Sequence, residues 1–346
     1  MQWTRGRLDR RLRPSLRQRR HVLRDSHRKI DLESFQLGGA MVAVRRVPPP
    51  LVADSLLSPG IGSLFLAVSL TGHPPRQENT FYTSDGTCIG MSIESDLIDV
   101  TREDRIATIT LNRPERKNAL SRALVCDLIE TVQFLEETAT RVVIIRGAGG
   151  TFSAGGDLEQ SPDEFVEEVS KSIDVIDAIH TSPVPYIAAI EGAAVGGGLE
   201  LALACDLRVA GVEARVGLPE TTVGIFPCAG GTRFLPRMIG TTRAKELVLT
   251  GRLISGDRAA SWGLVNRAVD AADVMDTASD LAEAISSNSP TAVEATLRST
   301  NEAFDTPVIE GTRWDEELAQ TVAHHPDFEE GKQAFLENRS PVFEDR

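Results

Sequence analysis

The sequence has 346 residues, of which 41% are apolar and 25% are charged, and its formal net charge at pH 7 is −13. The charge is uneven, because residues 1–90 hold 14 basic and 7 acidic residues whereas the other 256 hold 23 and 43. An acidic body lacks the basic surface that binds phosphate backbones, which argues against nucleic acid as a partner, and no apolar run reaches the roughly 18 residues that a membrane span requires.

Residues 1–90 differ in character from the rest of the chain. The first 30 are rich in arginine, three prolines follow at positions 48–50, and no helical or strand period is sustained. An organellar targeting peptide would also be rich in arginine, but it would be shorter, rich in serine and amphipathic. We therefore favour the interpretation that Met91 is the natural start and that residues 1–90 form a disordered extension.

Regular patterns begin at Met91. Apolar and polar residues alternate over 97–101 and 106–111 on either side of a charged turn, which predicts a hairpin. Apolar residues spaced three and four apart over 124–135 predict an amphipathic helix. The apolar run at 142–146 predicts a short buried strand.

A second helix is predicted to begin after Ser161. The sequence Ser-Pro-Asp-Glu at 161–164 has the pattern of a capping box with proline at the first helical position. The apolar face that this helix is expected to bury consists of Phe165, Val169, Ile173, Ile176 and Ile179.

Strands and helices continue to alternate to about residue 215. Residues 184–190 predict a buried strand, 198–204 a helix of small residues, and 207–210 a further strand. From residue 241 the patterns are helical almost to the end. We therefore expect an α/β fold with a core over residues 91–285 and a helical C-terminal part, residues 286–346, that belongs to the same fold.

Two glycine-rich segments have features of a site for developing negative charge. Residues 152–157 (FSAGGD) follow one predicted strand, and residues 191–200 (EGAAVGGGLE) lead directly into a predicted helix. Glycines let backbone N–H groups approach a ligand closely, and the free N–H groups and dipole of a helix start favour negative charge. For residues 152–157 an ordinary glycine-rich turn is the alternative.

Two carboxylates lie in apolar surroundings. Glu200 falls in the first turn of a helix that is apolar on nearly all sides, so we expect its side chain to be buried. Buried carboxylates without a functional role are uncommon. The alternative interpretation is that Glu200 is an ordinary carboxylate of the first helical turn, where the helix dipole stabilises negative charge. Glu220 ends the segment VGLPE, and the alternative interpretation is that it serves as a structural cap on a short loop.

The four cysteines, Cys88, Cys126, Cys205 and Cys228, show no CxxC spacing and no paired framework. This usage indicates reduced thiols in the cytoplasm and no metal site.

The order and spacing of the motifs resemble the crotonase superfamily, and most closely the enoyl-CoA hydratases. The resemblance extends from Asp99 to Phe343. It includes NRP and KNAL at 112–120, FSAGGD, IAAIEGAAVGGGLELALACD, GLPETTVGIFPCAGGTRFLPR, LTGRLISGDRAASWGLVNRAV and the tail EGKQAFLENRSPVF. The fold that it implies is a spiral of ββα units with a helical C-terminal part.

The resemblance also implies roles at the reaction centre. Gly156 and Gly197 match the two backbone N–H donors of the family's oxyanion hole, which would hold the thioester oxygen as it becomes enolate-like. Glu200 and Glu220 match the paired glutamates of the hydratases, which hold one water. In that pattern Glu200 takes a proton from the water and Glu220 relays a proton at C2 of the substrate.

The family's CoA and substrate contacts fall on Arg116, Lys117, Ala119, Ala154, Gly156, Asp157, Leu158 and Gly197. Two departures from the family pattern remove positive charge, since Glu159 stands where many hydratases have lysine, and residues 337–340 are Glu-Asn-Arg-Ser instead of Glu-Lys-Arg-Lys. These changes affect the expected contacts of the CoA phosphates and not the reaction centre.

The activity implied is the reversible hydration of a 2-enoyl-CoA to a 3-hydroxyacyl-CoA in fatty-acid or amino-acid degradation. Both glutamates are present, which favours a hydratase over an enoyl-CoA isomerase, although isomerase and 3-hydroxyacyl-CoA dehydratase activities remain alternatives. A non-catalytic acyl-CoA-binding or RNA-binding member is a more distant alternative. The resemblance implies no cofactor besides the acyl-CoA substrate, and a homotrimer or hexamer as the assembly.

Overall fold

The structure is a computed structural model that describes residues 78–82, 88–157 and 161–345. The expectation for residues 1–77 therefore lies outside the described residues. Residues 78–82 and 88–94 form an antiparallel pair of strands, β1 (Glu78–Tyr82) and β2 (Cys88–Glu94). The start expected at Met91 falls inside β2 and stays a prediction.

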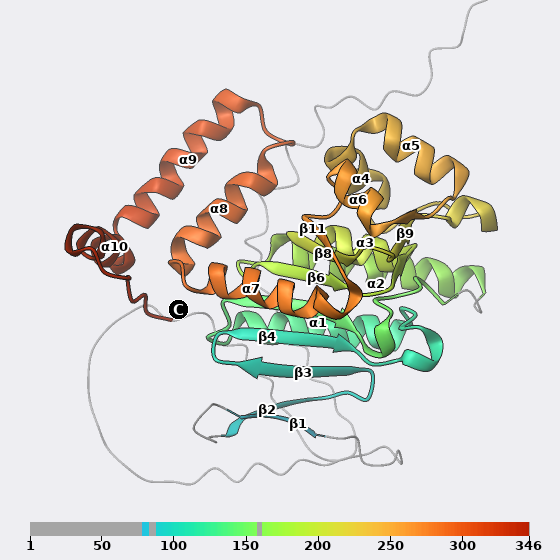
Figure 1. Cartoon of the computed structure of the whole chain (residues 1–346), viewed down its shortest axis with the longest axis horizontal. Coiled ribbons are helices and arrows are strands. Elements are labelled where there is room, and N and C mark those ends of the chain that lie inside the picture. The colour runs from blue at the N-terminus through green and yellow to red at the C-terminus, as the bar shows by residue number, and fades with distance from the viewer. Residues whose placement is uncertain (1–77, 83–87, 158–160, 346) are drawn as a thin grey trace, which may run out of the picture. The chain divides into compact units, whose positions relative to one another are not determined.

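A six-stranded sheet forms the centre of the fold (Figure 1). Its strands, in spatial order, are β11 (Arg267–Val269), β8 (Leu207–Gly211), β6 (Tyr186–Ile190), β5 (Val142–Gly147), β4 (Ile106–Leu111) and β3 (Ile98–Glu103). All neighbours are parallel except β3 and β4, which form the hairpin expected from the alternating pattern. A smaller sheet has the order β10 (Ile254–Ser255), β9 (Arg215–Gly217) and β7 (Ala193–Val195).

Helices cover both faces of the central sheet, which explains the unbroken apolar run in β5. Val142 and Ile144 face a cluster that includes Val274 and Ala278 of α7 (Val274–Ser286). Their neighbours along the strand belong to the main core, which includes residues of α1 (Arg122–Glu136), α2 (Pro162–Thr181) and α3 (Gly197–Ala204). Because successive side chains of a strand point to opposite faces, a strand that is buried on both sides is apolar at every position.

The remaining helices complete the C-terminal half. They are α4 (Gly231–Ile239), α5 (Thr241–Thr250), α6 (Gly256–Trp262), α8 (Pro290–Glu302), α9 (Val308–Ala323) and α10 (Pro326–Glu337), with short 3₁₀ turns η1 (Pro114–Arg116), η2 (Ala148–Gly150), η3 (Glu220–Val223) and η4 (Ala271–Asp273). None of the residues of α9 is buried. Among the helices of the described residues, none is both long and apolar enough to cross a bilayer.

Helix α2 begins as the sequence predicted. The Ser161 side chain accepts a hydrogen bond from the Glu164 backbone N–H, and the Glu164 carboxylate accepts from the Ser161 N–H. Its buried face differs in part from the expected one. Ile176 and Ile179 are buried, whereas Phe165 and Val169 are only half-buried. Ile173 is 38% exposed, and Val175 is buried in the core instead. The prediction that Ile173 is buried is wrong, because α2 packs through Val175 and Ile179, which lie one turn apart.

Arg208 on β8 fixes the C-terminal end of α3. The guanidinium is buried and donates hydrogen bonds to the carbonyl oxygens of Ala202 (3.1 Å), Cys205 (2.6 Å) and Leu264 (2.9 Å). The last carbonyls of a helix have no partner within it, so a cation here satisfies them and interacts favourably with the helix dipole. Arg208 therefore holds in place the helix that carries Glu200.

We expect Arg208→Met to destabilise the protein by about 3 kcal/mol, because it leaves three carbonyls without this donor in a buried site. In a thermal scan this corresponds to a fall in Tm of about 6–12 °C. Arg267→Met on the neighbouring strand is the control, since Arg267 is exposed and forms no ion pair with any of the described residues. Equal Tm values for the two variants would contradict the role of Arg208.

Candidate active site

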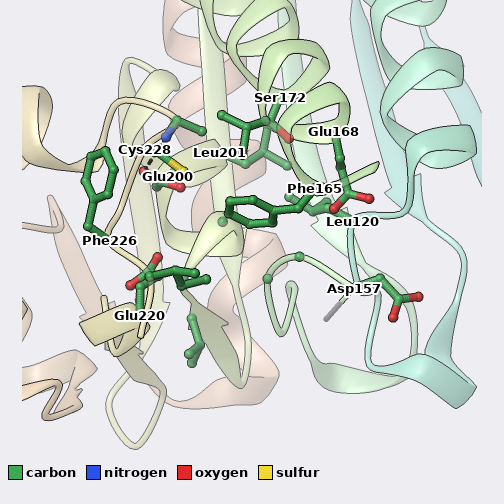
Figure 2. Close-up of a pocket in the computed structure, with 18 of the residues that line it drawn as sticks. Leu120, Asp157, Phe165, Glu168, Ser172, Glu200, Leu201, Glu220, Phe226 and Cys228 are labelled. Carbon is green, nitrogen blue, oxygen red and sulfur yellow. Dashed lines mark hydrogen bonds between the residues drawn. The ribbon is translucent and has the colours of Figure 1, made fainter. Parts of the chain in front are cut away.

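A cavity of about 180 Å³ lies between α2, α3 and the segments 154–157 and 219–229 (Figure 2). Its wall is mainly apolar, and the larger apolar side chains that line it are Leu120, Phe165, Val169, Val175, Ile176, Val195, Leu201, Val223, Ile225 and Phe226. Three glutamates interrupt this wall. Figure 2 shows Glu200 and Glu220 on one side of the cavity and Glu168 on the other.

Glu200 lies in the first turn of α3 and is only 3% exposed. Its Oε1 accepts hydrogen bonds from the backbone N–H groups of Ala229 and Gly231, both at 2.9 Å. Burial raises the pKa of Glu200 above its ordinary value, and the two N–H donors act in the opposite direction. The site thus contains a buried carboxylate with one oxygen held in a fixed orientation.

Glu220 opens η3 and is 9% exposed. Neither of its carboxylate oxygens has a hydrogen-bond partner among the described residues. Burial is the main cause that raises the pKa of Glu220 to about 7, and the negative charge of Glu200 adds to it. A buried carboxyl group without a hydrogen-bond partner in a mainly apolar cavity reduces stability, so such groups are candidates for function.

Glycines allow the backbone to come close to both carboxylates. A Cβ atom on Gly231 would lie 2.9 Å from the Glu200 Oε1, and one on Gly196 would lie 3.3 Å from the Glu220 Oε1. Gly196 also has a φ of +57°, which L side chains rarely adopt. Larger residues at these positions would displace the carboxylates.

The two predicted N–H donors, of Gly156 and Gly197, lie side by side. A Cβ atom on Gly197 would be 3.4 Å from the Gly156 nitrogen. The segments that carry them are joined because the Val195 N–H donates to the Ser153 carbonyl and the Ser153 N–H donates to the Ala193 carbonyl, both at 3.0 Å. Within the part of the chain that the structure describes, neither glycine N–H has a hydrogen-bond acceptor. Gly197 is also the first residue of α3, where the helix dipole favours negative charge.

The other predicted contact residues divide into three groups. Ala154 and Asp157 line the cavity together with the two glycines. Arg116, Lys117 and Ala119 lie on or just after the turn η1 and do not line it, although the Lys117 carbonyl accepts the Ala154 N–H at 2.9 Å. Leu158 lies outside the described residues. The role of all these residues in binding CoA stays a prediction.

Asn118 supports the loop beside the cavity, and sequence reasoning gave it no role. Its side-chain amide donates to the carbonyls of Ala148 (2.9 Å) and Thr151 (2.6 Å) and accepts from the Arg113 N–H (2.9 Å). The side chain is completely buried, and φ is +54°. Its place in the KNAL motif was the available signal, because asparagine tolerates this left-handed conformation better than most residues.

Sequence reasoning also missed Glu168 and Cys228, which both line the cavity. Glu168 lies seven residues before the buried Val175, a spacing that puts both on one face of α2 and could have identified it. Cys228 lies directly before Ala229, and Figure 2 shows its sulfur close to Glu200. Burial, then Glu200 and Glu220, raise the pKa of the Cys228 thiol, so the thiol stays neutral. In the described residues, no group of three or more His, Cys, Asp or Glu side chains is arranged to hold a metal ion.

Known proteins share both the sequence and the fold of this chain. The enoyl-CoA hydratase/isomerase family model matches residues 101–346. A putative enoyl-CoA hydratase/isomerase of Bacillus subtilis is 40% identical over 256 residues, which cover 71% of this chain and 97% of the relative. A probable mitochondrial enoyl-CoA hydratase of Arabidopsis thaliana is 35% identical over 286 residues, which cover 80% and 95%. The crystal structure of the Bacillus anthracis enoyl-CoA hydratase superposes with a TM-score of 0.70 at 40% identity and covers 71% of this chain and 98% of that one.

The burial of Glu220 predicts a pH-dependent stability. Its carboxyl titrates near the ordinary pKa of 4.5 when the chain is unfolded and near a pKa of about 7 when it is folded. Between these values the folded protein binds more protons, so stability falls as the pH rises from 4.5 through about 7. We expect Glu220→Gln to be more stable than the unaltered protein at pH 8, by up to about 3 kcal/mol, with little gain at pH 5.

Chemical denaturation at the two pH values measures this effect, with Glu213→Gln at an exposed position as the control. A gain for Glu220→Gln that is the same at pH 5 and pH 8 would show that titration of this carboxyl is not its source.

Proposed function

Because the chain belongs to the enoyl-CoA hydratase/isomerase family of the crotonase superfamily, as its sequence predicted, we propose that it is an enoyl-CoA hydratase. The proposed reaction is the reversible addition of water to a 2-enoyl-CoA, which gives a 3-hydroxyacyl-CoA. The observation that carries the proposal is the pair of buried glutamates from α3 and η3, which face one cavity beside two free backbone N–H groups. The acyl-CoA is the substrate, and the proposed reaction needs no cofactor.

Glu200 acts as the base in this proposal. Its Oε1 is held by Ala229 and Gly231, so the rest of the carboxylate is directed to the cavity. An ionised carboxylate in this position takes a proton from water as the water oxygen bonds to C3 of the substrate. The two N–H donors act against the effect of burial on the pKa of Glu200 and favour its ionised form, which is the form that acts as a base.

Glu220 supplies the proton at C2. With a pKa of about 7, a large share of this carboxyl is protonated at neutral pH. A proton donor works best when its pKa lies near the operating pH. The neighbouring charge of Glu200 helps to keep Glu220 protonated, so the environments of the two carboxyls favour opposite protonation states.

The N–H groups of Gly156 and Gly197 stabilise the intermediate stage. Addition at C3 moves electrons toward the thioester oxygen, which becomes enolate-like. Two donors that have no other acceptor, one of them at the N-terminus of α3, bind this oxygen more strongly as its charge develops. This differential binding lowers the barrier without tightening the binding of the ground state.

An enoyl-CoA isomerase is the second candidate. The Glu220 carboxyl has no partner among the described residues and a pKa of about 7, so it could carry a proton between C2 and C4 alone. The burial of Glu200 in the same cavity favours the hydratase, because an isomerase of the single-carboxylate type needs only one such group.

We also propose that the chain assembles as a homotrimer or hexamer. Helix α10 in the C-terminal part leaves large apolar side chains uncovered, since Phe335 is 85% exposed and Phe328 and Leu336 are exposed as well. Apolar side chains gathered on an exposed helical part are unusual for a monomer. Closed symmetric contact between copies would cover them.

The catalytic proposal predicts that Glu200→Gln and Glu220→Gln each lower kcat for 2-butenoyl-CoA hydration by roughly 10²–10⁴-fold, the usual contribution of a positioned acid or base, with little change in KM. The double variant should lose much less than the product of the two losses, since both groups act on one water. Glu213→Gln, at an exposed position, should keep normal activity.

Near-normal hydration by Glu200→Gln, together with none by Glu220→Gln, would contradict the shared-water mechanism. The isomerase candidate would then be preferred, and turnover of a 3-enoyl-CoA would test it.

For the assembly, light scattering in a buffer whose salt concentration suits the acidic surface should give the mass of three or six chains. Phe335→Glu should shift this mass toward that of the monomer, because it places a charge in the apolar contact. A monomeric mass for the unaltered protein would refute the proposal.

A further inference from the structure

A second and larger cavity, of about 640 Å³, adjoins the first. It lies between α2, α4 and the C-terminal end of α8. The two cavities have three lining residues in common, Ile176, Cys228 and Ala229. These side chains therefore form the partition between the two cavities.

Apolar side chains line part of the second cavity. Ile173 of α2 and Phe304, just after α8, line it and are exposed, and Phe234 and Met238 of α4 line it and are partly buried. Burial lowers the pKa of His180, whose ring packs against Phe234 with 5.0 Å between centroids, so the imidazole is neutral and extends this wall. Charged side chains line the same cavity, including Arg237 and Asp305, which form an ion pair.

The first cavity by itself is small for an acyl-CoA substrate. Its 180 Å³ is only slightly more than the about 150 Å³ of an engineered apolar cavity that binds benzene, so it holds an acyl group of roughly six carbon atoms. A longer acyl chain must extend beyond the first cavity. The partition at Cys228 is the place where additional apolar space begins.

The order of groups along the first cavity matches the order of atoms along an acyl chain. Gly156 and Gly197 would hold the thioester oxygen, and Glu200 and Glu220 would face C3 and C2. Cys228 comes next, since it directly precedes the Ala229 N–H that binds Glu200. Its side chain is short and its thiol is neutral, so an alkyl chain can pass it without burying a charge.

We propose that the second cavity holds the distal part of the acyl chain, and that the substrates are 2-enoyl-CoA thioesters whose acyl chains exceed about eight carbon atoms. The inference rests on the proposed function and specifies its substrate class. The partition formed by Ile176, Cys228 and Ala229 then acts as the passage between the reaction centre and the tail.

The test fills the second cavity without touching the first. Ile173 lines only the second cavity and is 38% exposed, so Ile173→Trp adds bulk there without disturbing the core. Val166→Trp on the same helix is the matched control, because Val166 is 66% exposed and lines neither cavity. Thr300→Trp fills the second cavity from α8 and serves as an independent second variant.

Calorimetry gives the Kd of butanoyl-CoA and dodecanoyl-CoA, and kcat/KM is measured for the corresponding 2-enoyl-CoA thioesters. The unaltered protein should bind dodecanoyl-CoA at least about tenfold tighter, since each buried CH₂ group changes affinity by up to about fourfold. Ile173→Trp and Thr300→Trp should weaken dodecanoyl-CoA binding about tenfold or more and leave butanoyl-CoA binding within about twofold. Val166→Trp should change neither.

The inference is overturned if dodecanoyl-CoA binds no tighter than butanoyl-CoA, or if the Ile173 and Thr300 variants behave like the Val166 control. The proposed function has a separate readout. If neither thioester is hydrated, the proposed hydratase activity is refuted. The Kd values of the variants then still show whether the acyl tail lies in the second cavity. Hydration of 2-butenoyl-CoA with an unchanged dodecanoyl-CoA affinity in Ile173→Trp would refute the tail cavity alone.

Discussion

The close approach of two backbone segments, 153–157 and 193–197, is the constraint on which the site depends. Strands β5 and β6 are parallel neighbours, so the segments that follow them leave the same edge of the sheet and meet there. A Cβ atom on Gly155 would lie 2.7 Å from the Val195 carbonyl oxygen, and one on Gly198 would lie 2.5 Å from the Ser153 carbonyl oxygen. Only glycine permits this contact, and the contact places two N–H groups beside each other.

The two glutamates have different hydrogen-bonding environments in this packing. Glu200 enters from a helix that Arg208 fixes at its far end, and two backbone donors hold one of its oxygens. Glu220 enters from a short turn and has no such donors among the described residues. Burial raises the pKa of both groups, but two N–H donors oppose this rise at Glu200, whereas the charge of Glu200 adds to it at Glu220. The fold thus places two like side chains in unlike hydrogen-bonding environments.

Features set by local sequence were predictable. The capping box at Ser161, the hairpin of β3 and β4 and the burial of Glu200 follow from spacing and composition within one element. The second cavity and the exposure of Ile173 depend on how α2 is rotated against α4 and α8, which no single element encodes. The convergence of Glu200 and Glu220 was inferred from a resemblance, because contacts between separate elements leave no periodic signal in one sequence.

The donors of Glu200 have a consequence for the order in which the protein folds. The carboxylate is bound by N–H groups 29 and 31 residues farther along the chain. Contacts of this kind form only after the intervening segment has closed into a loop. During synthesis, when a chain folds from its N-terminal side, α3 can pack against the sheet before residue 231 has left the ribosome. Its carboxylate gains its two donors only when the turn that begins α4 docks.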